Sequence, residues 1–148
     1  MLLVLDASVA VKWFLPPLPP EDEDLIPEAL SLLRQHGTGA VQFIVPDLFW
    51  AEVASVTWAA VRRQRWSSAD AVKALAHLIG YGFPSAPSNR LAQRALAITL
   101  SHGNGIYDNL YVALAQESNC DLVTADERLV KALGSRFPVR WLGSFSIT

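Results

Sequence analysis

The sequence contains a single cysteine, Cys120, among its 148 residues, and only 18% of the residues are charged. A lone cysteine excludes an intramolecular disulfide and a thiolate metal site. No apolar run approaches the ~20 residues that cross a bilayer, and the opening run is far too short for a signal peptide. We therefore expect a cytoplasmic protein without a membrane segment.

The motifs of several enzyme classes are also missing. There is no Gly-rich phosphate loop and no G-x-S-x-G elbow, and the three histidines lack metal-ligand spacing. A net charge of −2 argues against a generic basic nucleic-acid binder. The densest basic segment consists of Arg62, Arg63 and Arg65. It fits a solvated helix end and an RNA contact equally well.

Half of the chain (51%) is apolar, which predicts one globular domain over residues 1–148. Short apolar runs predict strands over 2–5, 42–45, 121–123 and 139–142, and a short or edge strand within 81–86. Helical patterns cover 7–14, 24–35, 47–64, 67–79, 88–101, 106–117 and 125–133, and the prolines of 16–20 predict a rigid loop. Strands separated by helices predict an α/β fold with a mainly parallel sheet that is covered on both faces.

Four carboxylates stand where an unpaired charge is costly. Asp6 ends the first apolar run, and Glu52, Asp108 and Asp126 each share a helix face with apolar residues. In parallel sheets, ligands bind beyond the carboxyl ends of the strands, which is where this chain places Asp6 and Asp126. Converging carboxylates need protons or cations, and a hard divalent cation with oxygen ligands suits them. The pattern predicts metal-assisted phosphoryl chemistry.

Three of these carboxylates also have structural explanations. Asp6 could cap the helix that follows it. Thr124 and Glu127 fit a capping box with Thr124 at the N-cap, which leaves Asp126 free to point toward the core. Asp108 lies in the first turn of its helix, where a carboxylate complements the helix dipole.

The helix predicted over 47–64 has two apolar faces, although a surface helix normally has one. One face includes Phe49, and the other includes Trp50 and Trp58. The second face is either buried within the domain or forms a protein interface. Glu52 lies in the middle of this helix, where capping is not available. Its structural alternative is a side chain that reaches solvent or pairs with an arginine.

Four segments, in this order and spacing, resemble the PIN-domain ribonucleases and, within them, the VapC-type toxins. They are Val4–Trp13 (VLDASVAVKW), Pro46–Val53 (PDLFWAEV), Tyr107–Ala115 (YDNLYVALA) and Leu122–Asp126 (LVTAD). The resemblance extends over essentially the whole chain. One departure is Asn109, which stands where the family usually has alanine and would place an additional polar group beside the site.

The resemblance implies a three-layer α/β/α domain and a Mg²⁺- or Mn²⁺-dependent endoribonuclease that acts as the toxin of a type II toxin–antitoxin system. Carried over by position, the catalytic and metal-binding residues are Asp6, Glu52, Asp108 and Asp126, supported by the hydroxyls of Ser8 and Thr124. The implied partners are RNA, a cognate VapB-like antitoxin and a second copy of the chain in a homodimer.

Two alternatives remain open. One is a catalytically inactive PIN-like module that binds RNA or protein. The other is a hydrolase of small phosphate esters, although such enzymes usually need a second aspartate where this chain has Ser8.

Overall fold

The computed structural model describes residues 1–15 and 24–147, and it shows one five-stranded sheet in the order β3-β2-β1-β4-β5. All four strand pairings are parallel. The strands are β1 (Leu2–Leu5), β2 (Gln42–Pro46), β3 (Ser85–Ala86), β4 (Asp121–Thr124) and β5 (Val139–Trp141). The α-helices are α1 (Ala7–Ala10), α2 (Ile26–Gly37), α3 (Leu48–Arg62), α4 (Ser68–Gly80), α5 (Ser88–His102), α6 (Ile106–Glu117) and α7 (Glu127–Leu133).

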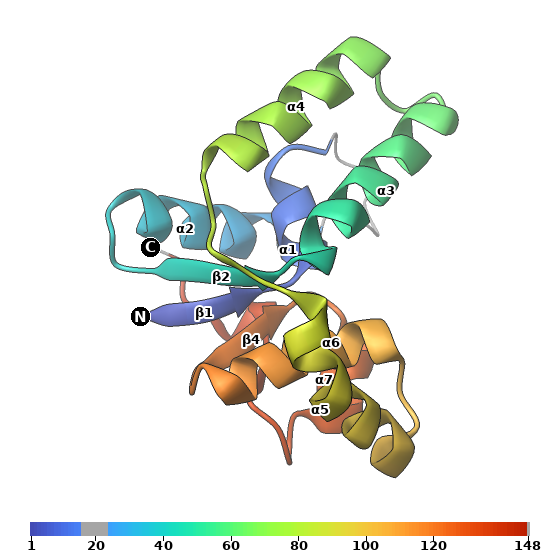
Figure 1. Ribbon diagram of the computed structural model, residues 1–148. Helices are drawn as coiled ribbons and strands as arrows, with labels where there is room; N and C mark the ends of the chain where they lie inside the picture. Colours follow the sequence, from blue (N-terminus) through green and yellow to red (C-terminus); the bar gives the residue numbers. More distant parts are fainter. Residues whose placement is uncertain (16–23, 148) are drawn as a thin grey trace.

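The helices cover the sheet on both faces, so that the α/β/α prediction is confirmed (Figure 1). α1 to α4 lie on one side of the sheet, and α5 to α7 lie on the other. This division follows from the right-handed crossovers that connect parallel strands, because the chain moves from β1 toward β3 and then returns to β4 and β5. The prediction of a mainly parallel sheet is confirmed as well.

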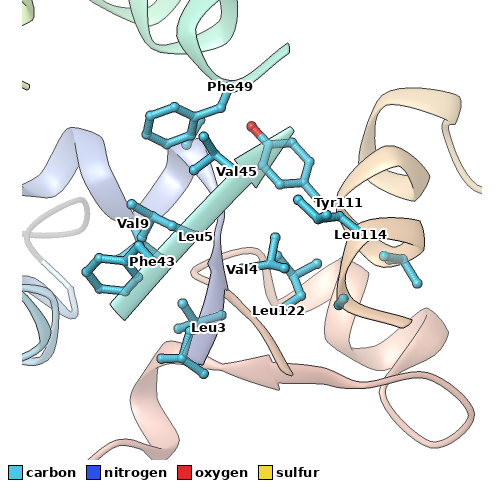
Figure 2. Close-up of a cluster of buried hydrophobic side chains, with 14 of the residues drawn as sticks. Leu3, Val4, Leu5, Val9, Phe43, Val45, Phe49, Tyr111, Leu114 and Leu122 are labelled. Atoms are coloured by element: carbon cyan, nitrogen blue, oxygen red, sulfur yellow. The ribbon is translucent and has the colours of Figure 1, made fainter. Parts of the chain in front are cut away.

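The core lies on both sides of the central strand β1. Leu3, Val4 and Leu5 are all buried, as expected for a strand with helices on both faces. Phe43 of β2 and Leu122 of β4 pack on the same cluster (Figure 2). Burying one such side chain contributes about 1.5–3 kcal/mol, so the core holds the ends of β1 and β4 in fixed positions.

The first two helices differ from the ranges that the sequence predicts. The helix expected over 7–14 ends at Ala10 and tightens into a 3₁₀ turn over Val11–Trp13. The indole N–H of Trp13 donates to the carbonyl of Ala29 (2.8 Å), which ties this turn to α2. α2 begins at Ile26 rather than residue 24 because Leu25 has a left-handed backbone (φ 67°). The proline loop predicted over 16–20 lies outside the described residues.

Other elements agree closely with their predictions. α3 starts one residue later and ends two residues earlier than the range 47–64, and β3 is the short edge strand predicted within 81–86. In the described ranges, no helix combines the length and the apolar character needed to cross a membrane.

Candidate functional site

The acidic site lies where the order of the sheet changes direction. β1 and β4 are neighbours in the middle of the sheet, and the chain leaves them toward opposite edges, which opens a crevice at their carboxyl ends. Asp6 follows β1 directly, and its backbone N–H donates to the carbonyl of Val123 in β4 (3.1 Å). Asp126 stands two residues beyond the end of β4. The fold therefore brings two carboxylates from distant parts of the sequence to one crevice.

Two hydroxyl groups hold the Asp6 carboxylate. Ser8 Oγ donates to Asp6 Oδ2 (2.7 Å) and accepts the backbone N–H of Ala125 (3.0 Å). Thr124 Oγ1 donates to the same oxygen (2.5 Å) and accepts the N–H of Asp126 (3.0 Å). Because each hydroxyl has one proton and uses it on Asp6, these bonds favour the ionised carboxylate. Oδ1 is the oxygen that neither hydroxyl engages.

Asp6 occupies the N-cap position of α1, but its side chain makes no capping hydrogen bond to that helix. The structural explanation for this residue is therefore wrong. Burial raises the pKa of Asp6, and the hydroxyls of Ser8 and Thr124 oppose that rise.

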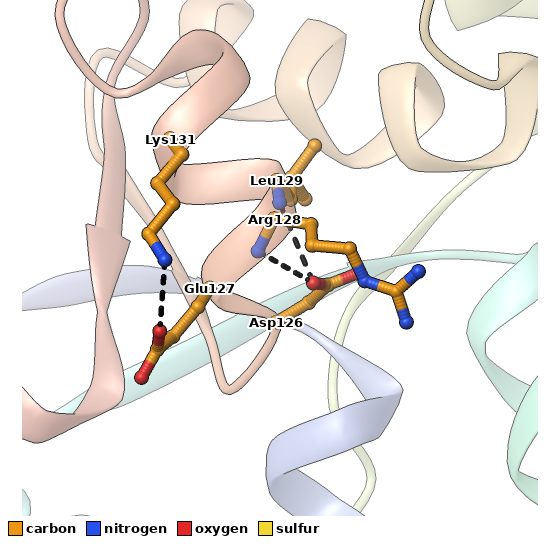
Figure 3. Close-up of polar contacts among 5 residues, drawn as sticks. All are labelled: Asp126, Glu127, Arg128, Leu129 and Lys131. Carbon is orange, nitrogen blue, oxygen red and sulfur yellow. Dashed lines mark hydrogen bonds and ion pairs between the residues drawn. The ribbon is translucent and has the colours of Figure 1, made fainter.

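Asp126 has the capping role that the sequence assigns to Thr124. Its Oδ1 accepts the backbone N–H groups of Arg128 (2.9 Å) and Leu129 (3.4 Å), and α7 begins at Glu127 (Figure 3). The predicted capping box is wrong because β4 extends through Thr124, whose hydroxyl is directed to Asp6 instead. Asp126 is thus fixed by its own helix, and its second oxygen Oδ2 lies outside these two bonds.

Glu52 projects from the second turn of α3 and is half-buried. Its Oε1 is enclosed by protein, yet it has no hydrogen-bond partner among the described residues. The same is true of the phenol oxygen of Tyr111, a residue of α6 that is only 2% exposed. The phenol is close enough to influence the carboxylate, although the two groups do not meet hydrogen-bond geometry. In the sequence, Tyr111 is simply one of the residues on the apolar helix face that it shares with Asp108.

The carboxylates act on one another electrostatically. Burial has the largest effect on Glu52 and raises its pKa. The Tyr111 phenol opposes that rise, and the negative charges of Asp6 and Asp108 add to it. For Asp108, which stands at the exposed rim, partial desolvation and then the charges of Asp6 and Asp126 raise the pKa. These mutual effects connect all four predicted residues into one acidic cluster.

Asp108 and Asp126 also line one pocket, together with Asn104 and Arg128. As the side chains stand, no group of three or more His, Cys, Asp and Glu residues within 1–15 and 24–147 has an arrangement that could hold a metal ion. The four carboxylates are linked by the effects of their charges on one another, but within the described residues they do not form a closed coordination cage.

The extra polar group of Asn109 is buried in the helix layer, and its amide is bound to Asn104, a residue that lines the pocket of Asp108 and Asp126. Asn109 is completely buried (0% exposed) between α6 and α5. Its Nδ2 donates to Thr99 Oγ1 (2.8 Å) and Asn104 Oδ1 (3.0 Å), and its Oδ1 accepts from Asn104 Nδ2 (2.6 Å). The extra polar group has its partners in the helix layer, and it holds the loop before α6 in place.

The fold and the crevice define a parallel α/β domain with an acidic site at the carboxyl edge of its central strands. The family model described as "PIN domain" matches residues 3–133, and the chain therefore belongs to the PIN-domain family. PIN domains are typically nucleases, and divalent metals are their usual cofactors.

Two solved structures share the fold. PAE2754 from Pyrobaculum aerophilum is 17% identical with a TM-score of 0.65, and the match covers 96% of this chain and 90% of that one. A toxin–antitoxin complex from Klebsiella pneumoniae is 18% identical with a TM-score of 0.56, and the match covers 93% and 95% of the two chains. A search of curated proteins found no match.

Proposed function

We propose that this chain is a Mg²⁺- or Mn²⁺-dependent endoribonuclease and the VapC-type toxin of a type II toxin–antitoxin pair. The observation that carries the proposal is the held carboxylate of Asp6, which lies in the electrostatic field of Glu52 and Asp108 at the switch point of the sheet. Membership of a family of nucleases supports the reaction class. The toxin–antitoxin complex among the structural neighbours supports the biological role.

The residues present fit a divalent cation. Glu52 Oε1 is a buried acceptor without a partner among the described residues, and desolvation, followed by the charges of neighbouring carboxylates, raises the pKa of both Glu52 and Asp108. Carboxylates that raise one another's pKa in this way are stabilised by a hard cation with oxygen ligands. Mg²⁺ keeps several waters and takes few carboxylates directly, so a closed cage of protein ligands is not required.

In this proposal, Asp6, Glu52 and Asp108 would hold the metal, and Asp126 would hold it directly or through water. The chemistry that such an ion would supply is a water of lowered pKa and stabilisation of charge on the phosphate. The hydroxyls of Ser8 and Thr124 favour the ionised form of Asp6 against the effect of burial on its pKa, and both bonds go to Oδ2 rather than Oδ1. The cap that Asp126 forms on α7 fixes that carboxylate relative to β4, so that little reorganisation is needed when RNA arrives.

Arg62 and Arg63 supply basic surface along the same helix as Glu52. Both are exposed at the carboxyl end of α3, where Arg62 is the last residue of the helix and Arg63 its C-cap, ten and eleven residues after Glu52. At 1.5 Å per residue this corresponds to roughly 15 Å along the helix axis. We assign them to the RNA strand at a distance from the cleaved bond, which makes them contributors to affinity rather than to chemistry.

The second apolar face of α3 is the surface that we assign to the antitoxin. Trp58 is 60% exposed, which excludes the alternative that this part of the face is buried in the domain. Val72 of α4 is 70% exposed, and both residues line one shallow apolar groove between α3 and α4. Exposed aromatic and aliphatic side chains gathered in a groove are typical of a protein contact. The groove also gives the homodimer a candidate contact.

The second candidate function is the inactive PIN-like module that binds RNA or protein. The observation in its favour is the lack of a ready-made group of three metal ligands within the described ranges. Against it stands the complete set of acidic residues with its supporting hydroxyls.

Cleavage of single-stranded RNA separates the two. We expect the protein to cut RNA with Mg²⁺ or Mn²⁺, and we expect EDTA and Asp6→Asn each to abolish cleavage. Lys131→Gln is a matched control, because that surface residue pairs with Glu127 and lies outside the cluster. Cleavage that persists with EDTA and in the Asp6 variant contradicts the metal mechanism. RNA binding without any cleavage supports the inactive module.

A further inference from the structure

A pocket of 420 Å³ opens beside the acidic cluster, between the loop that precedes α6 and the helix α7. It is lined by Asn104, Asp108, Asp126, Arg128, Leu129 and Ala132. Two of these are the outer carboxylates of the cluster. A molecule that enters this pocket therefore lies directly next to the proposed reaction centre.

Among the described residues that line the pocket, Arg128 is the only cation. Its backbone N–H is bound to Asp126, and its side chain extends past that carboxylate (Figure 3). Within the part of the chain that the structure describes, the guanidinium has no ion pair. The other cation of α7, Lys131, is paired with Glu127 (3.3 Å). Arg128 is thus a cation beside the acidic site, and no carboxylate of the described residues forms an ion pair with it.

A second polar residue of the pocket, Asn104, is held in a fixed position. Both ends of the Asn104 amide are bound to the amide of Asn109, at 2.6 Å and 3.0 Å, and Asn109 is in turn bound to Thr99. Because Asn109 is completely buried, this network anchors the loop before α6 to the helix layer. Leu129 and Ala132 add apolar surface from α7. The pocket therefore combines a cation, a fixed amide and an apolar wall.

We propose that this pocket binds the RNA nucleotide next to the bond that is cleaved, with Arg128 contacting its phosphate. The inference rests on the proposed function, because it concerns the same site. RNA carries one phosphate per nucleotide, and the phosphate at the carboxylates is not the only one that must be accommodated. The neighbouring phosphate needs a protein cation, and an arginine offers planar, bidentate donors to it. The apolar wall suits the sugar and base of the same nucleotide.

The role of Arg128 is that of a substrate-binding residue rather than a catalytic one. Its loss should weaken the binding of RNA and leave the chemistry of the bound complex largely intact. A phosphate contact also contributes to the salt dependence of binding, by about 0.7 in the slope of log K against log salt for a single strand. This slope separates a phosphate contact from a structural role, which leaves it unchanged.

The test compares the wild type with Arg128→Gln, Arg128→Lys and Lys131→Gln in the cleavage of a single-stranded RNA with Mn²⁺ at a series of salt concentrations. Arg128→Gln should raise KM roughly tenfold, which corresponds to one charged contact of about 1.4 kcal/mol, and kcat should change less than about twofold. Its salt slope should fall by about 0.7. Arg128→Lys should retain the slope because it keeps the charge, and Lys131→Gln should match the wild type.

Each failure has a distinct meaning. A wild type that cuts RNA, with the same KM and the same salt slope in Arg128→Gln, overturns the assignment of the pocket and leaves the proposed function intact. If kcat falls in Arg128→Gln while KM stays unchanged, the assignment of the pocket is also overturned, because that pattern indicates damage to the reaction centre. A wild type that cuts no RNA overturns the proposed function, and the pocket assignment with it.

Discussion

Replacing Tyr111 with phenylalanine tests the least expected feature of the site. The phenol oxygen of Tyr111 and Oε1 of Glu52 are both buried without a hydrogen-bond partner in the described part of the chain. A buried polar group without a partner costs about 1–3 kcal/mol. Tyr111→Phe removes one of these groups and leaves the packing of the ring in place. We therefore expect the metal-free protein to become more stable by about 1–3 kcal/mol.

The same substitution should weaken metal binding. The phenol lowers the pKa of Glu52 against the effect of burial, so it favours the ionised carboxylate that a cation requires. Loss of this influence, which is weaker than a formed hydrogen bond of about 0.5–1.5 kcal/mol, should weaken the affinity for Mn²⁺ by less than about tenfold. The Tyr111→Phe protein should thus gain stability and lose metal affinity. If Tyr111 had only a structural role, the substitution would lower the stability of the protein.

Thermal unfolding with EDTA and calorimetric titration with Mn²⁺ measure the two effects. For a chain of this size, 1 kcal/mol shifts Tm by roughly 2–4 °C, so the gain is measurable. Tyr107→Phe is the matched control, because Tyr107 lies on the same helix and is 66% exposed. A loss of stability in Tyr111→Phe, or an unchanged affinity for Mn²⁺, refutes the reasoning.

Three further predictions concern the network around the cluster. The metal-free protein should lose stability as pH rises from about 4, because raised pKa values in Asp6, Glu52 and Asp108 mean that the folded state holds protons that the unfolded state has released. Urea unfolding at a series of pH values measures this, and Asp6→Asn should flatten the profile. Asn109→Ala should cost about 1–3 kcal/mol in urea unfolding, because it leaves buried amide and hydroxyl partners unpaired. Thr124→Val should raise the pKa of Asp6 by removing one of its two hydroxyl donors, and should shift the acidic limb of the pH–activity profile upward.

Each of these has an outcome that contradicts it. If stability instead rises with pH above 4, the carboxyls of the cluster do not have raised pKa values in the folded state. An Asn109→Ala protein as stable as the wild type would show that the amide network contributes nothing to stability. If the acidic limb of the pH–activity profile is unchanged in Thr124→Val, the Thr124 hydroxyl does not affect the pKa of Asp6.

The order of strands and helices could be predicted because the periodicity of apolar residues is strong. Leu2–Leu5 reads as a strand buried on both faces, and the structure places it at the centre of the sheet. The proximity of Asp6 and Asp126 followed from the same reasoning, since parallel strands end at one edge. Local patterns and the rules of sheet topology determine these features.

The features that could not be predicted depend on tertiary contacts. Thr124 has the residues of a capping box around it, but the hydroxyl binds Asp6, a residue 118 positions away. Asn109 looked like a polar group beside the site, and only the packing of α5 on α6 shows that it is buried. Tyr111 fitted an apolar stripe, and its phenol is significant only because Glu52 lies across from it. No pattern within one helix contains this information.

Binding of Mn²⁺ with release of protons tests the central claim, that the acidic cluster is a metal site, most directly. Calorimetric titration in two buffers of different ionisation enthalpy gives both the affinity and the number of protons released. We predict saturable binding in which proton release increases as pH is lowered, because the carboxyls of Asp6, Glu52 and Asp108 have raised pKa values. Asp6→Asn should abolish this signal. Absence of saturable binding, or the same binding in Asp6→Asn, would contradict the account.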